Sequence, residues 1–330
     1  MMNFAQRILD RKTSVFDVEF VTPAFALGAD GEHAELREQT INGLLRFWWR
    51  AFFGSDDLDK MQKDESAIFG STSNRSDLKI FISNRNYSSR IENIPRGELI
   101  PVRSKGSTFN ISILEYLSYG LYDYERGNGN VFKKGHIKEN GRFSLTLSCS
   151  KKNEKKILTA LFLLSKFGGI GSRSRNGFGS MQIKNFDSSQ ITTEFDETLK
   201  SFTAFSHKAK IFKFQPENSW SRALSKIGIA YREARTRLEP RHMFDRRALA
   251  SKPIIVRNEI NISERHSKSY FLKVVKTKDN QFQGQILYLP YNYYRPDERD
   301  RYFNVYDDMN NFIHSQCLTE QSIKEALNDN

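Results

Sequence analysis

Cysteine is almost absent from this sequence. Only Cys149 and Cys317 occur among its 330 residues, and neither has a partner at the spacing of a metal-binding pair. So few cysteines in so long a chain are typical of a reducing cytoplasm and exclude a disulfide scaffold, so we expect a cytoplasmic protein. The six histidines are scattered without the spacing of a zinc-binding helix, and the sequence therefore predicts no metal site.

Long apolar runs are also missing. No stretch approaches the roughly 20 apolar residues that a membrane-spanning helix needs. The first residues, 1–4, lack the apolar core of a signal peptide. These two absences predict that the protein has no membrane partner.

Acidic residues are outnumbered by basic ones. The chain has 39 Asp and Glu against 51 Lys and Arg, which gives a net charge of +12 and a pI near 9.5. Such an excess favours a nucleic acid as partner. It is concentrated between Arg222 and Arg257, where ten Lys and Arg meet three acids. Arg232 and Arg235 lie there on the polar side of an expected helix over 220–238, and we interpret them as contacts to a phosphate backbone.

The stretch 168–180 is the most unusual feature that the sequence does contain. It holds five glycines, three serines and the arginines Arg173 and Arg175, between an apolar helix-like run and a strand-like run. Glycines let backbone N–H groups point into one concavity, and arginines fork onto phosphate oxygens. A plain turn remains an equal alternative on the glycines alone. The stretch has neither the P-loop nor the dinucleotide-binding pattern, so no nucleotide cofactor is predicted.

Residues 41–53 show helical periodicity, with apolar residues along one stripe. Arg46 and Arg50 share another face four residues apart. Together with the preceding Arg37 they form an arginine array suited to phosphate binding, although solvated side chains are the alternative. Gly43 is an unfavourable residue inside a helix and indicates close approach of another backbone or of a ligand.

The order of expected elements predicts the fold class. Strands at 14–20, 78–82, 142–148 and 181–186 alternate with helices at 41–53 and 154–167, which is the β-α-β-β-α-β order of a ferredoxin-like or RRM-like domain. A second, smaller α+β domain is expected beyond it, with the same topology. We thus predict an α+β protein of tandem ferredoxin-like domains with loop and helical insertions, divided into residues 1–200 and 201–330.

Several local predictions complete this picture. We expect a surface loop over 84–106, a short helix over 111–124 and a closing helix over 312–327. Strands are expected at 210–214, 253–256, 270–276 and 285–289.

Several blocks of the sequence resemble the RAMP superfamily of CRISPR effector proteins, and within it the subunits of the type III-B Cmr complex. These blocks are residues 22–25, 28–31, 35–37, 41–50, 69–71 and 116–120, the glycine-rich stretch 168–180, and an interrupted Arg-Ala-Ser-Pro motif at 247–253. They span most of residues 15–257. Two positions depart from the family pattern: Asn176 stands where a basic residue is common, and Lys252 separates the serine from the proline.

The resemblance implies a tandem of ferredoxin-like domains that binds RNA at one end of a complex of RAMP subunits. Guide RNA, or guide RNA paired with target RNA, is the implied partner, in antiviral defence. The end subunit of the family is not the one that cleaves the target, so no catalytic residue is expected.

Two hypotheses for function remain. The favoured one is a non-catalytic RNA-binding subunit in which arginines hold phosphates and loop amides fit around the backbone. The candidate RNA-binding residues are Arg37, Arg46, Arg50, Gly169, Gly171, Ser172, Arg173, Ser174, Arg175, Arg232 and Arg235. The alternative is a metal-dependent ribonuclease of the RAMP class that uses Asp30, with His33 nearby to move protons. A turn residue and an exposed loop histidine are the structural alternatives for these two.

Overall fold

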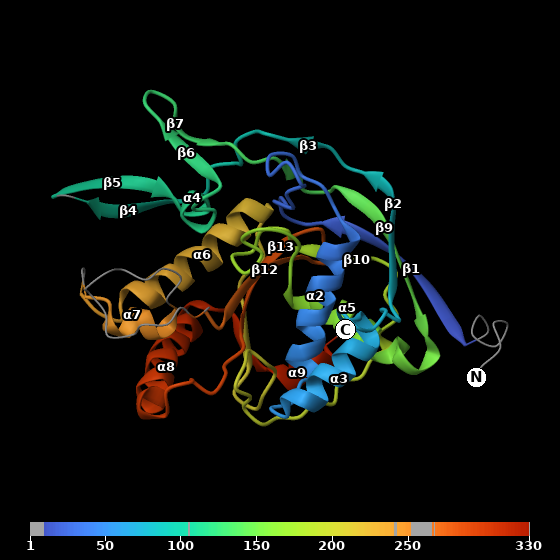
Figure 1. Cartoon of the computed structure of the whole chain (residues 1–330). Helices are drawn as coiled ribbons and strands as arrows, with labels where there is room; N and C mark the ends of the chain where they lie inside the picture. Colours follow the sequence, from blue (N-terminus) through green and yellow to red (C-terminus); the bar gives the residue numbers. More distant parts are fainter. Residues whose placement is uncertain (1–9, 105, 241–242, 252–265, 267, 330) are drawn as a thin grey trace. The chain divides into compact units, whose positions relative to one another are not determined.

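The chain forms two compact units in a computed structural model that describes residues 10–104, 106–240, 243–251, 266 and 268–329 (Figure 1). The first unit comprises the described residues up to 94, residues 120–196 and residues 327–329. The second comprises the described residues within 95–119 and 197–326. The predicted domain boundary at residue 200 stays a prediction, and in the compact units residues 95–119 group with the C-terminal half.

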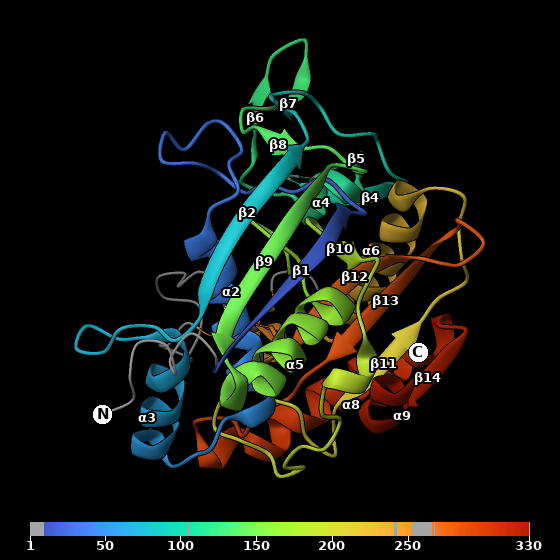
Figure 2. The ribbon, with the colours of Figure 1, turned by 90° about the vertical axis from the view of Figure 1, so that its right-hand side faces the viewer.

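The first unit is built on a four-stranded antiparallel sheet in the order β10-β1-β9-β2. Figure 2 shows β2, β9 and β1 side by side in this sheet. The elements in chain order are β1 (Arg11–Phe20), α2 (Glu38–Phe53), β2 (Lys79–Asn86), β9 (Arg142–Ser150), α5 (Lys151–Phe167) and β10 (Met181–Ile183). This is the predicted β-α-β-β-α-β order, and the ferredoxin-like topology of the first unit is confirmed.

The core of this unit is built from the buried side chains that alternate with exposed ones along the strands and from the apolar stripe of the helix. Phe16, Val18 and Phe20 of β1 are buried, whereas Val15 and Asp17, which point to the other face, are exposed. The apolar stripe of α2 is buried as well, and the helix packs on α5. At that contact the rings of Trp48 and Phe167 lie 6.3 Å apart.

Insertions extend this framework. They are α3 (Leu58–Phe69), the short pair β3 (Ser89–Arg90) and β8 (His136–Ile137), and the hairpin of β6 (Tyr122–Glu125) and β7 (Gly129–Phe132). The prediction of one helix over 111–124 is therefore wrong in extent. The helical part is α4 (Ile113–Leu117), because Gly120 takes a positive φ of 89° and ends the helical run before β6.

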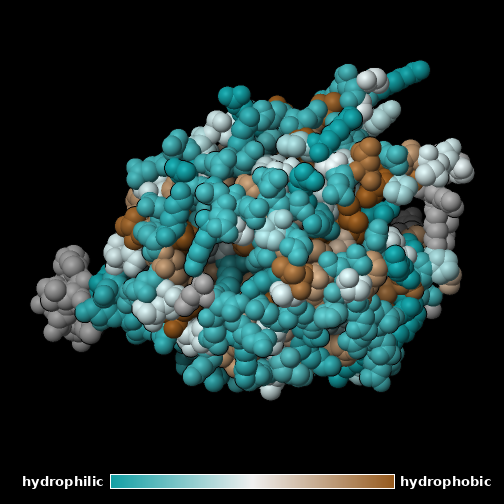
Figure 3. All heavy atoms as spheres, turned by 180° about the vertical axis from the view of Figure 1, so that it is seen from behind, coloured by the Kyte–Doolittle hydropathy of each residue, from teal (hydrophilic) through white to brown (hydrophobic). Residues whose placement is uncertain are grey.

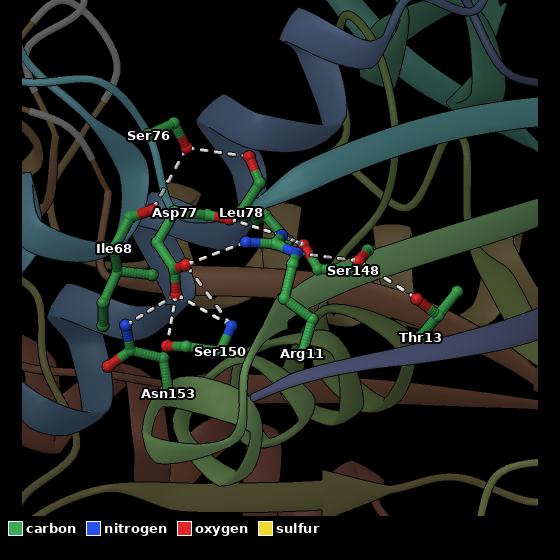
Figure 4. A network of polar contacts seen from close by, with 9 residues as sticks. All are labelled: Arg11, Thr13, Ile68, Ser76, Asp77, Leu78, Ser148, Ser150 and Asn153. Carbon is green, nitrogen blue, oxygen red and sulfur yellow. Dashed lines mark hydrogen bonds and ion pairs between the residues drawn. The ribbon is translucent and has the colours of Figure 1, made fainter. Parts of the chain in front are cut away.

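Asp77 joins the start of β2 to the end of β9 (Figure 4). Its carboxylate accepts hydrogen bonds from the Ser150 amide and hydroxyl and from the Asn153 side chain, the shortest at 2.7 Å, and Arg11 lies 3.2 Å away. Burial alone would raise the pKa of Asp77, but these donors outweigh burial and lower it. The ionised carboxylate thus fastens the edge strand to the first turn of α5.

The second unit repeats the topology of the first. Its sheet has the order β12-β13-β11-β14 and is antiparallel throughout. The elements in chain order are β11 (Lys210–Lys213), α6 (Trp220–Thr236), β12 (Tyr270–Lys276), β13 (Phe282–Tyr288), α8 (Arg299–Gln316) and β14 (Thr319–Ser322). When the four strands of each sheet are numbered in chain order, the strand order of the first sheet is 4-1-3-2, and the second sheet has the same order read from β14 to β12. The tandem of ferredoxin-like folds is therefore confirmed.

The second unit also carries a hairpin from the N-terminal half of the chain. Its strands are β4 (Leu99–Ser104) and β5 (Ser107–Ser112), and α4 follows it. The predicted loop over 84–106 therefore misses this hairpin. The helix α4 packs on α6 at Gly228, where an added Cβ would lie 2.7 Å from Leu117 Cδ1. The side-chain hydroxyl of Ser225 accepts a hydrogen bond from the Glu98 amide at 3.4 Å.

Buried tyrosines fill the core of the second unit. Tyr270, Tyr288 and Tyr306 form one group with ring centroids 5.2 to 5.5 Å apart. The Tyr270 hydroxyl donates to Asn310 at 2.7 Å, and the Tyr306 hydroxyl donates to the Ala250 carbonyl at 2.6 Å. Because each of these hydroxyls has an acceptor, the rings can be buried without an unpaired polar group.

The end of the chain differs from the predicted helix over 312–327. Helix α8 ends at Gln316, β14 follows, and α9 (Ile323–Asn328) closes the chain. The prediction was wrong because β14 completes the sheet, and backbone pairing with β11 prevails over the helical spacing of its residues. The predicted strand at 253–256 lies outside the described residues.

No helix in the described part of the chain is long and apolar enough to cross a membrane. On the face drawn in Figure 3, hydrophilic side chains predominate and hydrophobic ones form small separate groups.

Candidate nucleic-acid interface

The glycine-rich loop 168–180, between α5 and β10, is fastened to the segment 21–26 that follows β1. The Gly179 amide donates to the Pro23 carbonyl at 2.7 Å, and the Thr22 hydroxyl donates to the Gly177 carbonyl at 2.8 Å. The Ser172 amide donates to the Phe25 carbonyl at 2.9 Å. The two segments therefore form one rigid piece of backbone.

Backbone contacts explain why this loop needs its glycines. A Cβ on Gly179 would lie 1.9 Å from the Ile170 carbonyl oxygen, and a Cβ on Gly171 would lie 2.7 Å from the Phe25 carbonyl. Both residues also have positive φ, 65° and 100°. These glycines thus serve the close approach of protein backbone, which agrees with the structural alternative for them, and a phosphate-binding concavity of loop amides stays a prediction.

Phe25 links the loop to two further segments. Its ring packs against Phe178 of the loop at 5.4 Å, against Phe132 of β7 at 5.8 Å and against His136 of β8 at 5.1 Å. The loop, the 21–26 segment and the hairpin β6–β7 are thus joined through one buried aromatic residue.

Two of the predicted phosphate ligands are held by contacts outside the loop. Arg173 has a φ of 61°, which is unusual for a residue other than glycine, and its guanidinium lies over Gly120. An added Cβ at Gly120 would be 2.8 Å from Arg173 Nη2. The Arg175 guanidinium lies 5.4 Å from the centre of the Phe47 ring of α2. Both arginines are therefore placed by the fold.

The loop amides that were predicted to face a phosphate have more varied positions. Gly169 is buried and paired with Ser180 in an isolated bridge. The Ser172 amide is used by Phe25, so only the side chain of this exposed residue faces outward. Gly171 and Ser174 are partly exposed. Phosphate binding by these residues stays a prediction.

Arg46 and Arg50 of α2 converge on one carboxylate that the sequence analysis missed. Glu65 of α3 has a side chain only 10% exposed; it pairs with Arg50, whose Nη2 lies 2.7 Å from Glu65 Oε1, and with Arg46 Nε at 3.3 Å. Arg46 also donates to the carbonyls of Phe69 and Gly70, at 3.1 and 2.7 Å. These guanidinium groups therefore clamp α2 to α3, and the 15 to 19 residues that separate the partners hid this from local spacing rules.

Arg37 occupies the position just before α2 and donates to the Leu27 carbonyl at 3.4 Å. Helix α2 begins at the next residue. Gly43 of this helix is exposed, and a Cβ on it would meet no described atom within 4 Å outside the backbone of its own helix. Within the described residues, the close approach of another protein backbone that was expected at Gly43 is thus absent. Gly43 lies one turn from Phe47, which carries Arg175.

Arg232 and Arg235 lie on α6 in the second unit. Arg232 donates to the Pro101 carbonyl at 3.0 Å and lies 5.8 Å from the centre of the Tyr116 ring, so it holds the β4–β5 hairpin. Arg235 lies in the last turn of the helix, and its Nε is buried.

Asp30 and His33, the candidates of the alternative hypothesis, form a small turn. Asp30 Oδ1 accepts hydrogen bonds from the amides of Glu32 and His33 at 2.9 and 3.1 Å, and Oδ2 lies 2.8 Å from His33 Nδ1. The Glu32 amide and the two His33 groups lower the pKa of Asp30 to about 2. Such a carboxylate accepts a proton poorly near neutral pH. Among the described residues there is no group of three His, Cys, Asp or Glu side chains placed to hold a metal ion.

Comparison with known proteins gives related sequences from Pyrococcus furiosus. The CRISPR system Cmr subunit Cmr1-2 is 27% identical over 184 residues, which cover 52% of this chain and 95% of that protein. The subunit Cmr1-1 is 29% identical over 194 residues, which cover 55% of this chain and 52% of that protein, so the chain spans about half the length of this relative.

Solved structures share the fold. The crystal structure of Cmr1 from Pyrococcus furiosus, in its apo form, has a TM-score of 0.57 at 20% identity and covers 94% of this chain and 98% of that one. A chain of the cryo-EM structure of the type III-B Cmr-beta complex bound to cognate target RNA has a TM-score of 0.51 at 12% identity, with 92% and 100% covered.

A sequence model of the RAMP superfamily matches residues 17–182. This range contains most of the first ferredoxin-like sheet, the 21–26 segment and the glycine-rich loop fastened to it. The match covers half of the chain, and the chain belongs to the RAMP superfamily.

Proposed function

We propose that this protein is a non-catalytic RNA-binding subunit of a type III-B CRISPR effector complex and acts in antiviral defence. Membership of the RAMP superfamily, the similarity to two Cmr1 subunits and the net charge of +12 support the proposal. The partners are other RAMP subunits, guide RNA and target RNA, with this subunit at one end of the complex.

The placement of Arg173 and Arg175 carries the proposal. Both lie on a loop that backbone hydrogen bonds make rigid, and its glycines permit the close contacts that these bonds need. An arginine that the fold already orients loses less side-chain entropy when it binds a phosphate. We infer that the loop, with Gly43 and Phe47 of α2 beside Arg175, forms the surface along which the RNA backbone runs.

The remaining candidates contribute differently in this proposal. Arg37, Arg46 and Arg50 hold the start of α2 and its contact with α3, and the face they leave exposed adds positive charge to the RNA surface. Gly169, Gly171, Ser172 and Ser174 shape the loop, and the Ser172 and Ser174 side chains are its polar groups.

Binding of single-stranded RNA and of a guide–target duplex, measured by fluorescence anisotropy over a range of salt concentrations, tests this function. Arg173→Ala and Arg175→Ala should each weaken binding about equally for different sequences, because phosphate contacts carry no sequence information. Each should also reduce the slope of log affinity against log salt by about 0.7 for single strands. Arg75→Ala, at an exposed arginine of the α3–β2 connection, is the matched control. Unchanged affinity and slope in both loop variants would refute the proposed surface.

A ribonuclease using Asp30 is the second candidate, favoured by the exposed Asp30–His33 pair. Incubation of guide-matched RNA with the purified chain and with the assembled complex, in the presence of divalent metal, distinguishes the two. We expect no cleavage that depends on Asp30, because its oxygens hold the turn. Cleavage that Asp30→Ala abolishes, while RNA binding persists, would establish the enzyme instead.

A further inference from the structure

Arg235, in the last turn of α6, has no counter-ion among the residues that the structure describes. Arg235 is partly buried, its Nε is fully buried, and in the part of the chain that the structure describes no hydrogen-bond acceptor reaches this atom. No ion pair joins its guanidinium to any described carboxylate. Removing a charged donor from water without a partner is unfavourable, so the position calls for an acceptor.

A second arginine lies beside it. Arg247 of α7 (Asp245–Ala250) donates through Nη2 to the carbonyls of Thr236, Glu239 and Pro240, at 3.3, 2.7 and 3.3 Å. These contacts fix it next to the end of α6, with a side chain only 14% exposed. Its Nε is also buried without a hydrogen-bond acceptor. Burial and the nearby Arg235 charge lower the pKa of Arg247, against the opposing effect of Glu239.

The acid that lies close to Arg247 is engaged in capping α7. Glu239 is 4% exposed, and its two carboxylate oxygens accept hydrogen bonds from the Arg246 and Arg247 amides at 2.9 and 3.1 Å. Its Oε1 lies 3.9 Å from Arg247 Nε. The carbonyls at the end of α6 favour cations there, but they bond Arg247 and leave Arg235 without an acceptor.

Two further residues complete the group. The Tyr116 ring carries the Arg232 guanidinium on its face, and Tyr116 acts on the pKa of both Arg247 and Tyr231. Arg232, Arg235, Arg247 and Tyr116 are named here the α6–α7 arginine cluster. All four belong to the second unit.

We propose that the α6–α7 arginine cluster is a phosphate-binding site in which Arg235 is the principal ligand. Its guanidinium can donate to two phosphate oxygens at once, and Arg247 adds positive charge from a fixed position. The identification of the ligand as a backbone phosphate of RNA rests on the proposed function. The affinity of the site for a phosphate group does not depend on the proposed function.

The test uses the full chain labelled with ¹⁵N-arginine, so that the Nε–H resonances are observed directly. Inorganic phosphate is titrated first, and a short oligouridine RNA in a separate sample. We expect saturable shifts of the Arg235 and Arg247 resonances with both ligands. Arg235→Ala should weaken phosphate binding about tenfold or more. Arg235→Lys keeps the charge and should retain part of the affinity. Arg222→Ala, at an exposed arginine of the same helix that pairs with Glu217, should bind as the unaltered chain does.

The outcomes separate this inference from the proposed function. No shift of the Arg235 resonance with phosphate, or equal binding by both Arg235 variants and the unaltered chain, overturns the site. RNA binding that is strong but indifferent to Arg235 refutes RNA as the ligand of this site and leaves the proposed function intact. Phosphate binding that depends on Arg235 in a chain that fails to bind RNA supports the site and refutes the RNA-binding function.

Discussion

The substitution Gly43→Ala distinguishes the effect of Gly43 on the stability of the fold from its effect on the affinity for RNA. Gly43 lies inside α2, beyond the first turn, and faces open space. A glycine there is unfavourable for the helix and is not required by any neighbouring atom. We expect the alanine variant to be more stable and to bind RNA less tightly.

The magnitudes follow from the geometry. Alanine is preferred to glycine in a helix interior by about 1 kcal/mol, and no atom lies within 4 Å of the added Cβ to offset this gain. The free energy of unfolding should therefore rise by about 1 kcal/mol. If the RNA backbone packs against this turn of the helix beside Phe47 and Arg175, the methyl group enters a filled contact. Overpacking of about 1 kcal/mol corresponds to a loss of about fivefold in affinity.

Urea unfolding measures the first effect, and RNA anisotropy measures the second. Gly228→Ala is the matched control, because it also adds a Cβ to a helix glycine. There the Cβ would lie 2.7 Å from Leu117 Cδ1 and 3.0 Å from Ile113 Cγ1, both buried. Overpacking should exceed the gain in helix propensity, with a net loss of roughly 1 kcal/mol. A Gly43→Ala variant that is more stable but binds RNA unchanged would show that RNA does not approach this face, and one that is less stable would refute the reasoning about open space.

Three further predictions concern single side chains. Glu65→Gln should lower the free energy of unfolding by on the order of 1 kcal/mol in urea, because its partners Arg46 and Arg50 are partly exposed. Asp77→Asn should cost about 1 to 3 kcal/mol by the same measurement, and since its pKa is lowered, the stabilisation by Asp77 is present above the unfolded pKa and lost as pH falls through the folded one. The Asp30 carboxylate should titrate by NMR near pH 2, below its ordinary 3.8, so its contribution is complete above pH 3.8 and lost toward pH 2. Asp30→Asn should speed hydrogen exchange at the Glu32 and His33 amides, and unchanged exchange would contradict the turn.

The sequence was sufficient for the topology but not for the insertions. Strands such as 142–148 and helices such as 220–238 alternate or repeat at one period over many residues, so their type follows from local pattern. The hairpin of β4 and β5 has no such pattern, with Leu99 and Phe109 exposed. Its place is set by α6, more than a hundred residues later, through contacts such as Arg232 to Pro101. Local periodicity holds no information of this kind.

The candidate site shows the same limit. Sequence identified Arg46 and Arg50 as an array on one helix face, but only the fold reveals that Glu65 lies between them. It also identified the glycines of the loop, whereas their close contacts are with Phe25 and Ile170. Neither the pairing with Glu65 nor the contacts of the loop glycines could be predicted, because charge and spacing along a sequence do not show which groups the fold brings together.

The contacts that each arginine already makes within the fold determine how much it should contribute to phosphate binding. Arg46 and Arg50 share a buried carboxylate, so drawing them toward a phosphate would weaken an existing contact and return little net affinity. Arg175 rests on the face of the Phe47 ring, which orients the guanidinium before any ligand binds. Arg235 forms no hydrogen bond or ion pair with any described residue, so a phosphate there would form new bonds without weakening an existing contact. Among residues of equal formal charge, Arg235 should therefore contribute the most per phosphate, and Arg46 and Arg50 the least.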